Sequence, residues 1–314
     1  MSAIITLTMN PAVEVNSATD QVVSNRKLRC DAVTREPGGG GINVARAIRN
    51  LGESVRAIFL AGGMTGDRLT ALVSEEGVES HPIRIAGETG EVVNVTERHS
   101  GLHFRFVMEG PAVREAEWKT ALATIRDLDP VPRYLVASGA LPKGAPENFY
   151  GRLSAIAVER GFRLIVDTTG PPLRHAIGAG MFLIKPNLSE LRELTGNAGG
   201  ALSDFFLEGA ASALVSTGRS GAVVISMGSG GAIVATERGS RRIAAPIVDV
   251  ASRAGAGDSM VGGIVVALER GLPIEEAALF GIAAGSAAVM MPGTQLCGRE
   301  DTERLFDELK RRVA

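Results

Sequence analysis

Aromatic residues, cysteines and histidines are all scarce in this chain of 314 residues. Aromatics make up 4% of the sequence, too few for the stacking surfaces that bind single-stranded nucleic acid. Cys30 and Cys297 lie far apart without metal-ligand spacing, and the histidines form no HExxH pattern. The sequence therefore predicts two incidental thiols in a reducing compartment and no zinc site of the common types.

A strong charge of either sign is absent too. The formal net charge is −2, and charged residues make up 22% of the chain. Such a chain has no general attraction to nucleic acid or to an anionic membrane. Any affinity for a phosphate group must therefore be built locally.

Long apolar runs are also missing. The most apolar segment, residues 281–291, is rich in Ala and Gly and ends at Pro292, whereas a membrane span needs about 20 apolar residues. The first residues lack the basic start and the apolar stretch of a signal peptide. We therefore expect a cytoplasmic protein whose partners include neither a membrane nor a nucleic acid.

Short β-rich runs alternate with helical patterns along most of the chain. Strands are predicted at 4–8, 133–137, 163–167, 181–184 and 222–227, and helices at 42–51, at 146–160 and from 190. This alternation predicts an α/β fold with a doubly wound, mostly parallel sheet and helices on both faces. Ligands bind such sheets beyond the carboxyl ends of the strands, where several glycine and polar clusters of this sequence fall.

Two stretches break the alternation, at about 13–33 and 91–108. Both have the alternating pattern of strands and no long helix between them. They predict a small sheet that projects from the main body as a lid or a dimer interface. Peripheral strands that complete the main sheet are the alternative.

Asp258 stands at the start of a predicted helix, directly after Gly255, Ala256 and Gly257. Small residues before a helix let backbone N–H groups approach an anion, and the helix dipole adds partial positive charge there. An acidic residue at this position is also typical of a helix cap. Spacing alone favours the cap over a catalytic carboxylate.

Lys185 follows a predicted strand, and lysine is rare in this chain. A lysine at a strand end can meet a phosphate as a point charge. Asn187 and Glu190 come next, and their spacing allows them to organise water around Mg²⁺. The same spacing suits a capping box with Asn187 as the N-cap, and the two interpretations are compatible.

Two glycine clusters complete the set of motifs. Residues 38–41, followed by Asn43, allow close backbone approach to a ligand, although they match neither a Walker A motif nor GxGxxG. A flexible turn is the alternative for them. Residues 226–231 end another predicted strand and suit either a nucleotide site or an ordinary turn.

Together these segments resemble the PfkB family of ribokinase-like carbohydrate kinases, and the similarity is greatest to its minor bacterial ATP-dependent 6-phosphofructokinases. The segments that carry the resemblance are 255–258, 38–41 with Asn43, 6–8, 27–30, 36–37, 43–47, 105–108, 257–262, 283–288 and 296–297. The resemblance implies one ribokinase-like domain over residues 1–314, with a small β lid from about 13–33 and 91–108. It further implies a homodimer through the lids, with ATP and Mg²⁺ as cofactors.

The resemblance also implies a role for each motif. Asp258 would be the catalytic base, and the N–H groups of Gly255, Ala256 and Gly257 would meet the charge on the transferred phosphoryl group. The residues implied on the ATP side are Lys185, Asn187, Ser226, Gly228, Gly231, Gly285 and Ser286, with Asn187 and Glu190 holding the metal through water. Those implied to bind the sugar are Glu14, Lys27, Arg29, Gly39, Gly40, Gly41, Asn43 and Arg105.

Departures from the family pattern concern the acceptor. Glu14 stands where these phosphofructokinases have an aspartate, Gly90 where they have an arginine, and Ala140 where they have a serine. Losing a charge-assisted hydrogen bond costs about 1.5–3 kcal/mol. Either Lys27, Arg29, Arg105 or Arg253 compensates for the lost contacts, or the acceptor differs.

The leading hypothesis is therefore an ATP-dependent kinase that converts fructose 6-phosphate to fructose 1,6-bisphosphate. The alternative is a related kinase for fructose 1-phosphate, tagatose 6-phosphate or an unphosphorylated sugar or nucleoside, which the glycine at position 90 favours. A third hypothesis is a binding protein that no longer catalyses, which the intact Asp258 and its glycines disfavour.

Overall fold

A computed structural model describes residues 3–177, 180–197 and 203–313. Within these ranges the main sheet has nine strands in the order β13-β12-β11-β10-β9-β8-β1-β4-β5. They are β1 (Ile4–Thr8), β4 (Arg56–Ala61), β5 (Glu79–Arg84), β8 (Tyr134–Ser138), β9 (Arg163–Asp167), β10 (Met181–Ile184), β11 (Ser220–Ser226), β12 (Ala232–Thr236) and β13 (Gly239–Ile243). All neighbours pair in parallel except β11 with β12 and β12 with β13, which pair antiparallel.

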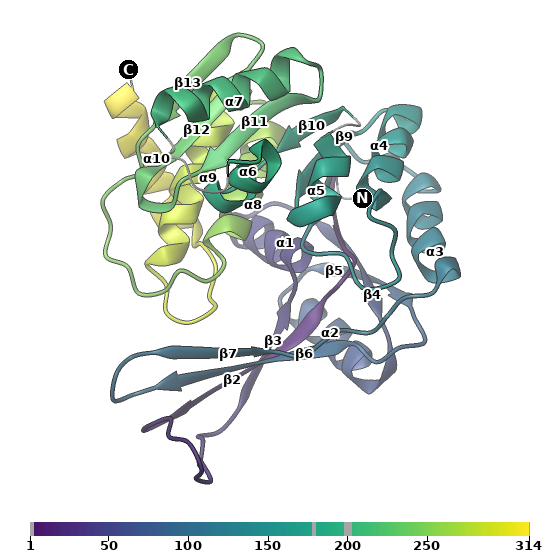
Figure 1. The fold of residues 1–314 in the computed structure, drawn as a ribbon, viewed down its shortest axis with the longest axis vertical. Coiled ribbons are helices and arrows are strands. Elements are labelled where there is room, and N and C mark those ends of the chain that lie inside the picture. The colour runs from purple at the N-terminus through teal and green to yellow at the C-terminus, as the bar shows by residue number, and fades with distance from the viewer. Residues whose placement is uncertain (1–2, 178–179, 198–202, 314) are drawn as a thin grey trace.

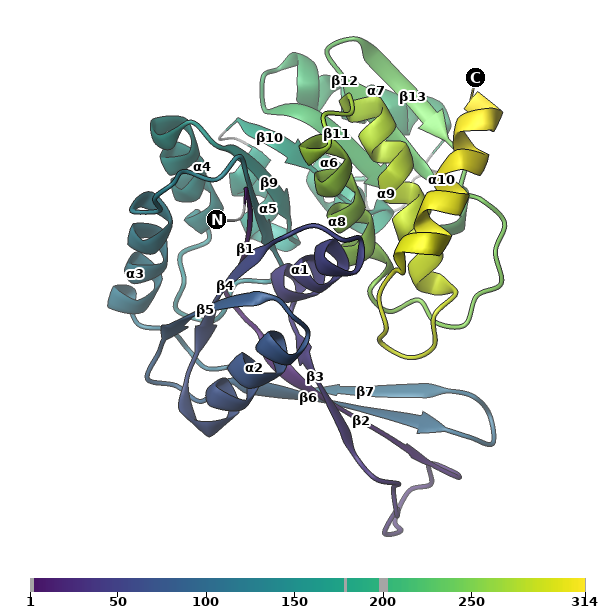
Figure 2. The same ribbon diagram turned by 180° about the vertical axis from the view of Figure 1, so that it is seen from behind.

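Helices cover both faces of this sheet (Figures 1 and 2). They are α1 (Gly40–Asn50), α2 (Gly63–Glu75), α3 (Glu115–Arg126), α4 (Phe149–Arg160), α5 (Gly170–Ile177), α6 (Leu188–Thr195), α7 (Asp204–Ser216), α8 (Ala256–Glu269), α9 (Ile274–Val289) and α10 (Arg299–Val313). Helices α1, α2, α8, α9 and α10 contribute to one apolar cluster, and α3 to α7 contribute to the other. No helix among the described residues is long and apolar enough to cross a membrane.

The two clusters follow from alternation along each strand, because successive side chains point to opposite faces. In β1, Ile4 packs on one face, whereas Ile5 and Leu7 pack on the other. Burial on both faces gives these strands their continuous apolar sequence. The predicted doubly wound α/β fold is confirmed. The largest shift of a predicted helix boundary is at α4, which begins at Phe149 because Pro146 precedes the helix in a turn.

A second, four-stranded sheet projects from the main body (Figures 1 and 2). Its order is β3-β2-β6-β7, with bounds β2 (Ala12–Thr19), β3 (Thr34–Gly38), β6 (Gly90–Glu97) and β7 (His103–Val107). These strands do not extend the main sheet. Residues 20–33 form no strand, so the predicted stretch 13–33 is strand only up to Thr19, and the chain re-enters the sheet at Thr34.

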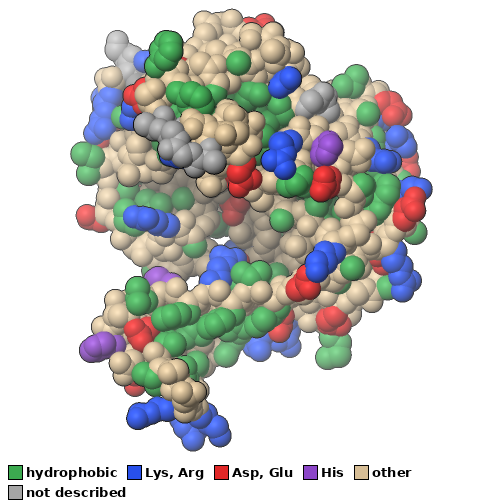
Figure 3. Space-filling model, viewed as in Figure 1, with side chains coloured by type: hydrophobic (Ala, Val, Ile, Leu, Met, Phe, Trp, Pro, Cys, Tyr) green, Lys and Arg blue, Asp and Glu red, His purple; other side chains and the backbone are tan. Residues whose placement is uncertain are grey.

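The two faces of the second sheet differ in chemistry. The register aligns Val15 with Val93 and Val93 with Phe106, and this face carries an apolar stripe that is visible as green side chains in Figure 3. The opposite face carries Glu14 and Arg105. The polar face lines the cavity described next, whereas the outer part of the apolar face is exposed, with half of Phe106 accessible.

Candidate active site

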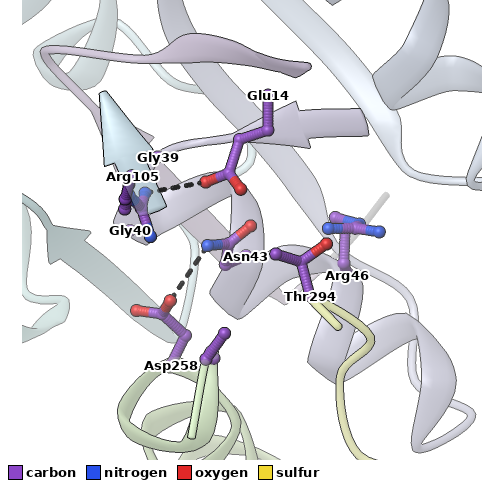
Figure 4. Close-up of a pocket in the computed structure, with 10 residues that line it drawn as sticks. Glu14, Gly39, Gly40, Asn43, Arg46, Arg105, Asp258 and Thr294 are labelled. Carbon is purple, nitrogen blue, oxygen red and sulfur yellow. Dashed lines mark hydrogen bonds and ion pairs between the residues drawn. The ribbon is translucent and has the colours of Figure 1, made fainter. Parts of the chain in front are cut away.

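A cavity lies between the second sheet, α1 and the start of α8 (Figure 4). It is lined by Glu14, Gly39, Gly40, Asn43, Arg46, Arg105, Ala254, Gly255, Asp258 and Thr294. These residues come from five separate segments of the chain, which only the fold brings together.

Asp258 lies in the first turn of α8, but its side chain does not cap that helix. Its Oδ2 instead accepts a hydrogen bond of 3.0 Å from Nδ2 of Asn43 on α1 (Figure 4). The interpretation of Asp258 as a mere cap is therefore wrong. The pKa of Asp258 is raised to about 7, chiefly by burial and also by the nearby charge of Asp167, whereas the hydrogen bond from Asn43 opposes the rise. A carboxylate with this pKa is suited to accept a proton near neutral pH.

The turn before Asp258 can be made only with glycine at position 255. Gly255 has φ of 70°, and a Cβ there would lie 2.3 Å from Cδ2 of Leu296. Ser259 N–H makes the first helical bond, to Gly255 O, so the preceding N–H groups of α8 have no partner within the helix. The turn therefore presents free N–H groups at a positive helix end, which is a ready site for an anion.

Lys185 reaches the same turn from the end of β10. A Cβ at Gly257 would lie 3.8 Å from Lys185 Nζ, and that Nζ pairs with Asp167 Oδ1 at 3.2 Å. Burial lowers the pKa of Lys185, but the charge of Asp167 and its neighbouring carboxylates outweighs burial, so the net pKa is raised. The lysine is thus held charged beside the N–H groups.

Asp167 is a residue that sequence reasoning missed. It ends β9, so its signal was an acidic residue at the carboxyl end of a predicted strand, where parallel sheets place their ligands. Burial raises the pKa of Asp167, and the charge of Lys185 opposes this rise.

Asn187 and Glu190 form the predicted capping box at the start of α6. Asn187 Oδ1 accepts from Glu190 N–H at 2.9 Å, and Glu190 Oε2 accepts from Asn187 N–H at 2.8 Å. The capping interpretation is confirmed. The box leaves Glu190 Oε1 outside it, so an oxygen remains that could face water around a cation.

The glycine loop before α1 packs against the ends of two strands. Cβ atoms at Gly40 and Gly41 would lie 2.4 Å from Ser138 Oγ and 2.5 Å from Leu7 O, and Gly39 has φ of 114°. Close approach therefore requires these glycines. Gly39, Gly40 and Asn43 line the cavity, whereas Gly41 is buried against β1 and is absent from the lining.

Glu14 and Arg105 face each other across the second sheet. Glu14 Oε1 pairs with Arg105 Nη2 at 3.0 Å, and Glu14 Oε2 accepts from Asn94 Nδ2 at 3.1 Å. Both carboxylate oxygens of Glu14 are thus occupied. Arg46 and Thr294 also line the cavity, and sequence reasoning gave neither of them a role. Arg46 lies in the segment 43–47 that carries the resemblance, whereas Thr294 lies in none of those segments.

Lys27 and Arg29 are not brought to the cavity of their own chain. The Arg29 carbonyl accepts from Thr19 Oγ1 at the far end of β2. Thr19 is about five residues beyond Glu14, a distance of roughly 17 Å along a strand. Both cations therefore lie near the outer end of the second sheet.

The other residues predicted for the nucleotide lie at the end of β11 and on α9. Gly228 and Gly231 follow β11, and Ser226 N–H bonds to Pro186 O beside the capping box. Gly285 of α9 packs on the start of α8, since a Cβ there would lie 3.0 Å from Ala256 O. Ser286 is the next residue of α9 and is buried. Lys185 and Gly285 thus adjoin the N–H turn, Ser226 adjoins the capping box, and none of the predicted nucleotide residues lines the cavity described above.

Comparisons with known proteins agree with this geometry. The family model described as pfkB family carbohydrate kinase matches residues 3–301. The chain is 41% identical over 304 residues to ATP-dependent 6-phosphofructokinase isozyme 2 of Mycobacterium tuberculosis (strain ATCC 25618 / H37Rv), with 97% of this chain and 89% of that protein covered. It is 38% identical to the Escherichia coli (strain K12) protein of the same name, with 99% and 100% covered.

Solved structures give the same result. The crystal structure of phosphofructokinase-2 from Escherichia coli in complex with fructose-6-phosphate has a TM-score of 0.92 and 37% identity, covering 99% of this chain and 100% of that one. The ribokinase of Arabidopsis thaliana, with a TM-score of 0.76 and 17% identity over 98% and 99% of the two chains, shows the fold alone.

Proposed function

The chain belongs to the pfkB family of carbohydrate kinases, and from this premise we propose that it transfers the γ-phosphoryl group of ATP to fructose 6-phosphate, which gives fructose 1,6-bisphosphate and ADP. The choice of fructose 6-phosphate as the acceptor rests on whole-chain identity of 38% and 41% to proteins named ATP-dependent 6-phosphofructokinase. The chemistry is supported by the buried Asp258, the free N–H groups of its turn, and the charged Lys185 beside them.

In the proposed mechanism, Asp258 accepts the proton of the acceptor hydroxyl as that oxygen attacks the γ-phosphorus. The bond to the β-phosphate oxygen breaks, and ADP leaves with its electron pair. The N–H groups of the 255–257 turn stabilise the charge on the transferred phosphoryl group, and Lys185 adds a fixed positive charge. Asn43 holds Asp258 in place through the 3.0 Å hydrogen bond.

Mg²⁺ would neutralise charge on the β- and γ-phosphate oxygens. Asn187 and Glu190 would hold it through water, since Glu190 Oε1 is not used by the capping box. Ser226, Gly228, Gly231, Gly285 and Ser286 would line the nucleotide. On the acceptor side, we assign Glu14, Gly39, Gly40, Asn43 and Arg105 to the sugar.

We further propose that the second sheet is a lid on a single catalytic domain and that two copies pair through it. The apolar stripe of Val15, Val93 and Phe106 is the face available for a second copy. Lys27 and Arg29, remote from their own cavity, would then lie within the dimer. A structure of phosphofructokinase-2 from Escherichia coli is described as a tetrameric inhibited form, so assembly is observed among relatives.

Replacing Phe106 by Glu should dissociate this dimer. A charge buried without a partner in an apolar interface costs several kcal/mol, so we expect the dissociation constant to rise at least about 100-fold. Sedimentation velocity at micromolar concentration should show twice the chain mass of 32.7 kDa for the wild type and the single mass for the variant. Val158→Glu, at another exposed apolar position, on α4, is the matched control and should stay dimeric. A monomeric wild type, or a dimeric Phe106→Glu variant, would contradict the proposal.

One observation favours a different acceptor. Each arginine in the cavity is already paired, Arg105 with Glu14, and Arg46 with Glu36 and Glu76. A sugar phosphate must take Arg105 from Glu14 or find a cation from a second copy. An unphosphorylated sugar or nucleoside needs no such cation. The second candidate is therefore a related kinase for such an acceptor, or for another sugar phosphate such as fructose 1-phosphate or tagatose 6-phosphate. The 1-phosphofructokinase of Bacillus subtilis (strain 168) is 28% identical over 307 residues, with 98% of each chain covered.

A coupled ADP-release assay over sugars and sugar phosphates tests the function. We expect the highest kcat/KM with fructose 6-phosphate. A higher value with fructose 1-phosphate or tagatose 6-phosphate would establish the second candidate, and activity on neutral sugars alone would overturn both phosphorylated acceptors. If calorimetry shows ATP and an acceptor binding but no product forms, the chain is a binding protein instead.

A further inference from the structure

Residues 290–297, between α9 and α10, contact the start of α8. Leu296 packs on Gly255, where a Cβ would lie only 2.3 Å from Leu296 Cδ2. Cys297 N–H donates to Ser259 Oγ at 3.3 Å. The end of this segment is thus fixed at two places to the turn that forms the phosphoryl-binding half of the site.

The same segment also contacts the second sheet. Thr294 Oγ1 donates a 2.7 Å hydrogen bond to Glu36 Oε2, and Glu36 lies in β3. Beyond Glu36, β3 ends at Gly38 and leads directly into the glycine loop that lines the cavity. One side chain, Thr294, therefore connects the turn of Asp258 to the strand that carries the acceptor loop.

Glu36 also depends on Thr294 for its position. Arg46 Nη2 reaches the same Oε2 atom at 3.4 Å, a long contact, and bonds to Glu76 Oε1 at the shorter distance of 2.9 Å. Across the β2–β3 ladder, Glu36 lies directly opposite Glu14, and like charges at such positions repel each other. Without the Thr294 hydroxyl, Glu36 would keep only the longer contact with Arg46.

We propose that Thr294 is a positioning residue that couples the phosphoryl-binding turn to the acceptor side of the site through its hydrogen bond to Glu36. Nucleotide bound at the turn holds residues 290–297 in place, and Thr294 then holds β3 and the glycine loop for the acceptor. The coupling rests on the proposed function only for the choice of acceptor, since the contacts themselves involve no sugar.

Hydrogen exchange of the Thr294→Val variant tests the coupling without any acceptor. Valine keeps the shape of threonine and removes the donor. With the non-hydrolysable analogue AMP-PNP and Mg²⁺, wild-type peptides covering 34–38 and 255–262 should both become protected. In Thr294→Val, protection should persist at 255–262 and be lost at 34–38. Equal protection of 34–38 in both proteins would overturn the proposal, as would its absence in the wild type.

Kinetics supply the second arm. We expect Thr294→Val to raise the KM for fructose 6-phosphate about tenfold, as loss of a hydrogen bond to a charged group predicts, with kcat and the KM for ATP within about twofold. In a Glu36→Leu background, Thr294→Val should not raise the KM for fructose 6-phosphate any further. Thr120→Val, at an exposed site on α3, is the control. An undiminished effect in the Glu36→Leu background, or equal losses for ATP and acceptor, would show a merely structural role.

The two arms separate this proposal from the proposed acceptor. If the wild type does not phosphorylate fructose 6-phosphate, the acceptor assignment fails, and the kinetic comparison is made with the best acceptor of the ADP-release assay. The exchange result stands or falls independently of that outcome.

Discussion

Replacing Asp258 by Asn should lower kcat by about 10²- to 10⁴-fold while ATP binding is retained. Asparagine has the same shape and can still accept the hydrogen bond from Asn43, but it cannot take the proton of the acceptor hydroxyl. The loss should therefore appear in turnover and not in calorimetric affinity for ATP. Asp307→Asn, an exposed carboxylate on α10, is the control and should keep full activity. Near-full turnover in the Asp258→Asn variant would contradict its role as the base.

The pH profile gives this prediction a second measurement. Asp258 must be ionised to act as a base, and its pKa is raised by burial to about 7. In the wild type, kcat should rise with pH and level off above about 7, and this rise should be missing from the residual activity of the variant.

The free energy of unfolding should change with pH in the opposite direction to kcat. Because the folded pKa lies above the ordinary value of 3.8, ionisation of Asp258 costs the folded state stability as pH rises from about 4 to 7. Asp258→Asn should therefore be the more stable protein at pH 8.

Much of the fold could be predicted because its signals are local. Alternating strands and helices indicated the doubly wound sheet, and Gly255 and the glycines at 39–41 marked the places where backbone segments approach closely. The capping box at Asn187 was equally local, since both of its hydrogen bonds join residues three apart.

Other parts of the site depend on contacts between distant segments and could not be predicted. Asp167 pairs with Lys185, and Thr294 reaches Glu36 across more than half of the chain. Spacing in the sequence also favoured a cap for Asp258, because only the packing of α1 against α8 reveals Asn43 as its partner. For Lys27 and Arg29 the sequence suggested too much. Motif similarity assigned both residues to the sugar, but neither lines the cavity of its own chain.

Lys185→Met should cost both stability and turnover. Removing one partner of a buried ion pair leaves an uncompensated charge and typically costs about 3–5 kcal/mol. Here that charge is Asp167, which is paired with Lys185 at 3.2 Å. The loss should be greater at the higher of two pH values, because without Lys185 the raised pKa of Asp167 lets this carboxylate take a proton more readily at the lower one. Urea unfolding at the two pH values measures the effect.

The double variant Asp167→Asn/Lys185→Met separates the two roles of the lysine. With both charges removed, most of the lost stability should return, because no unpaired charge of this pair remains. Turnover should stay about 10²- to 10³-fold below the wild type, since the positive charge beside the N–H turn is still missing. Asp167→Asn alone keeps Lys185 and should retain more activity than either variant that lacks it. If the double variant recovered activity together with stability, Lys185 would serve only to neutralise Asp167, and the charge that meets the phosphoryl group would have to come from another residue.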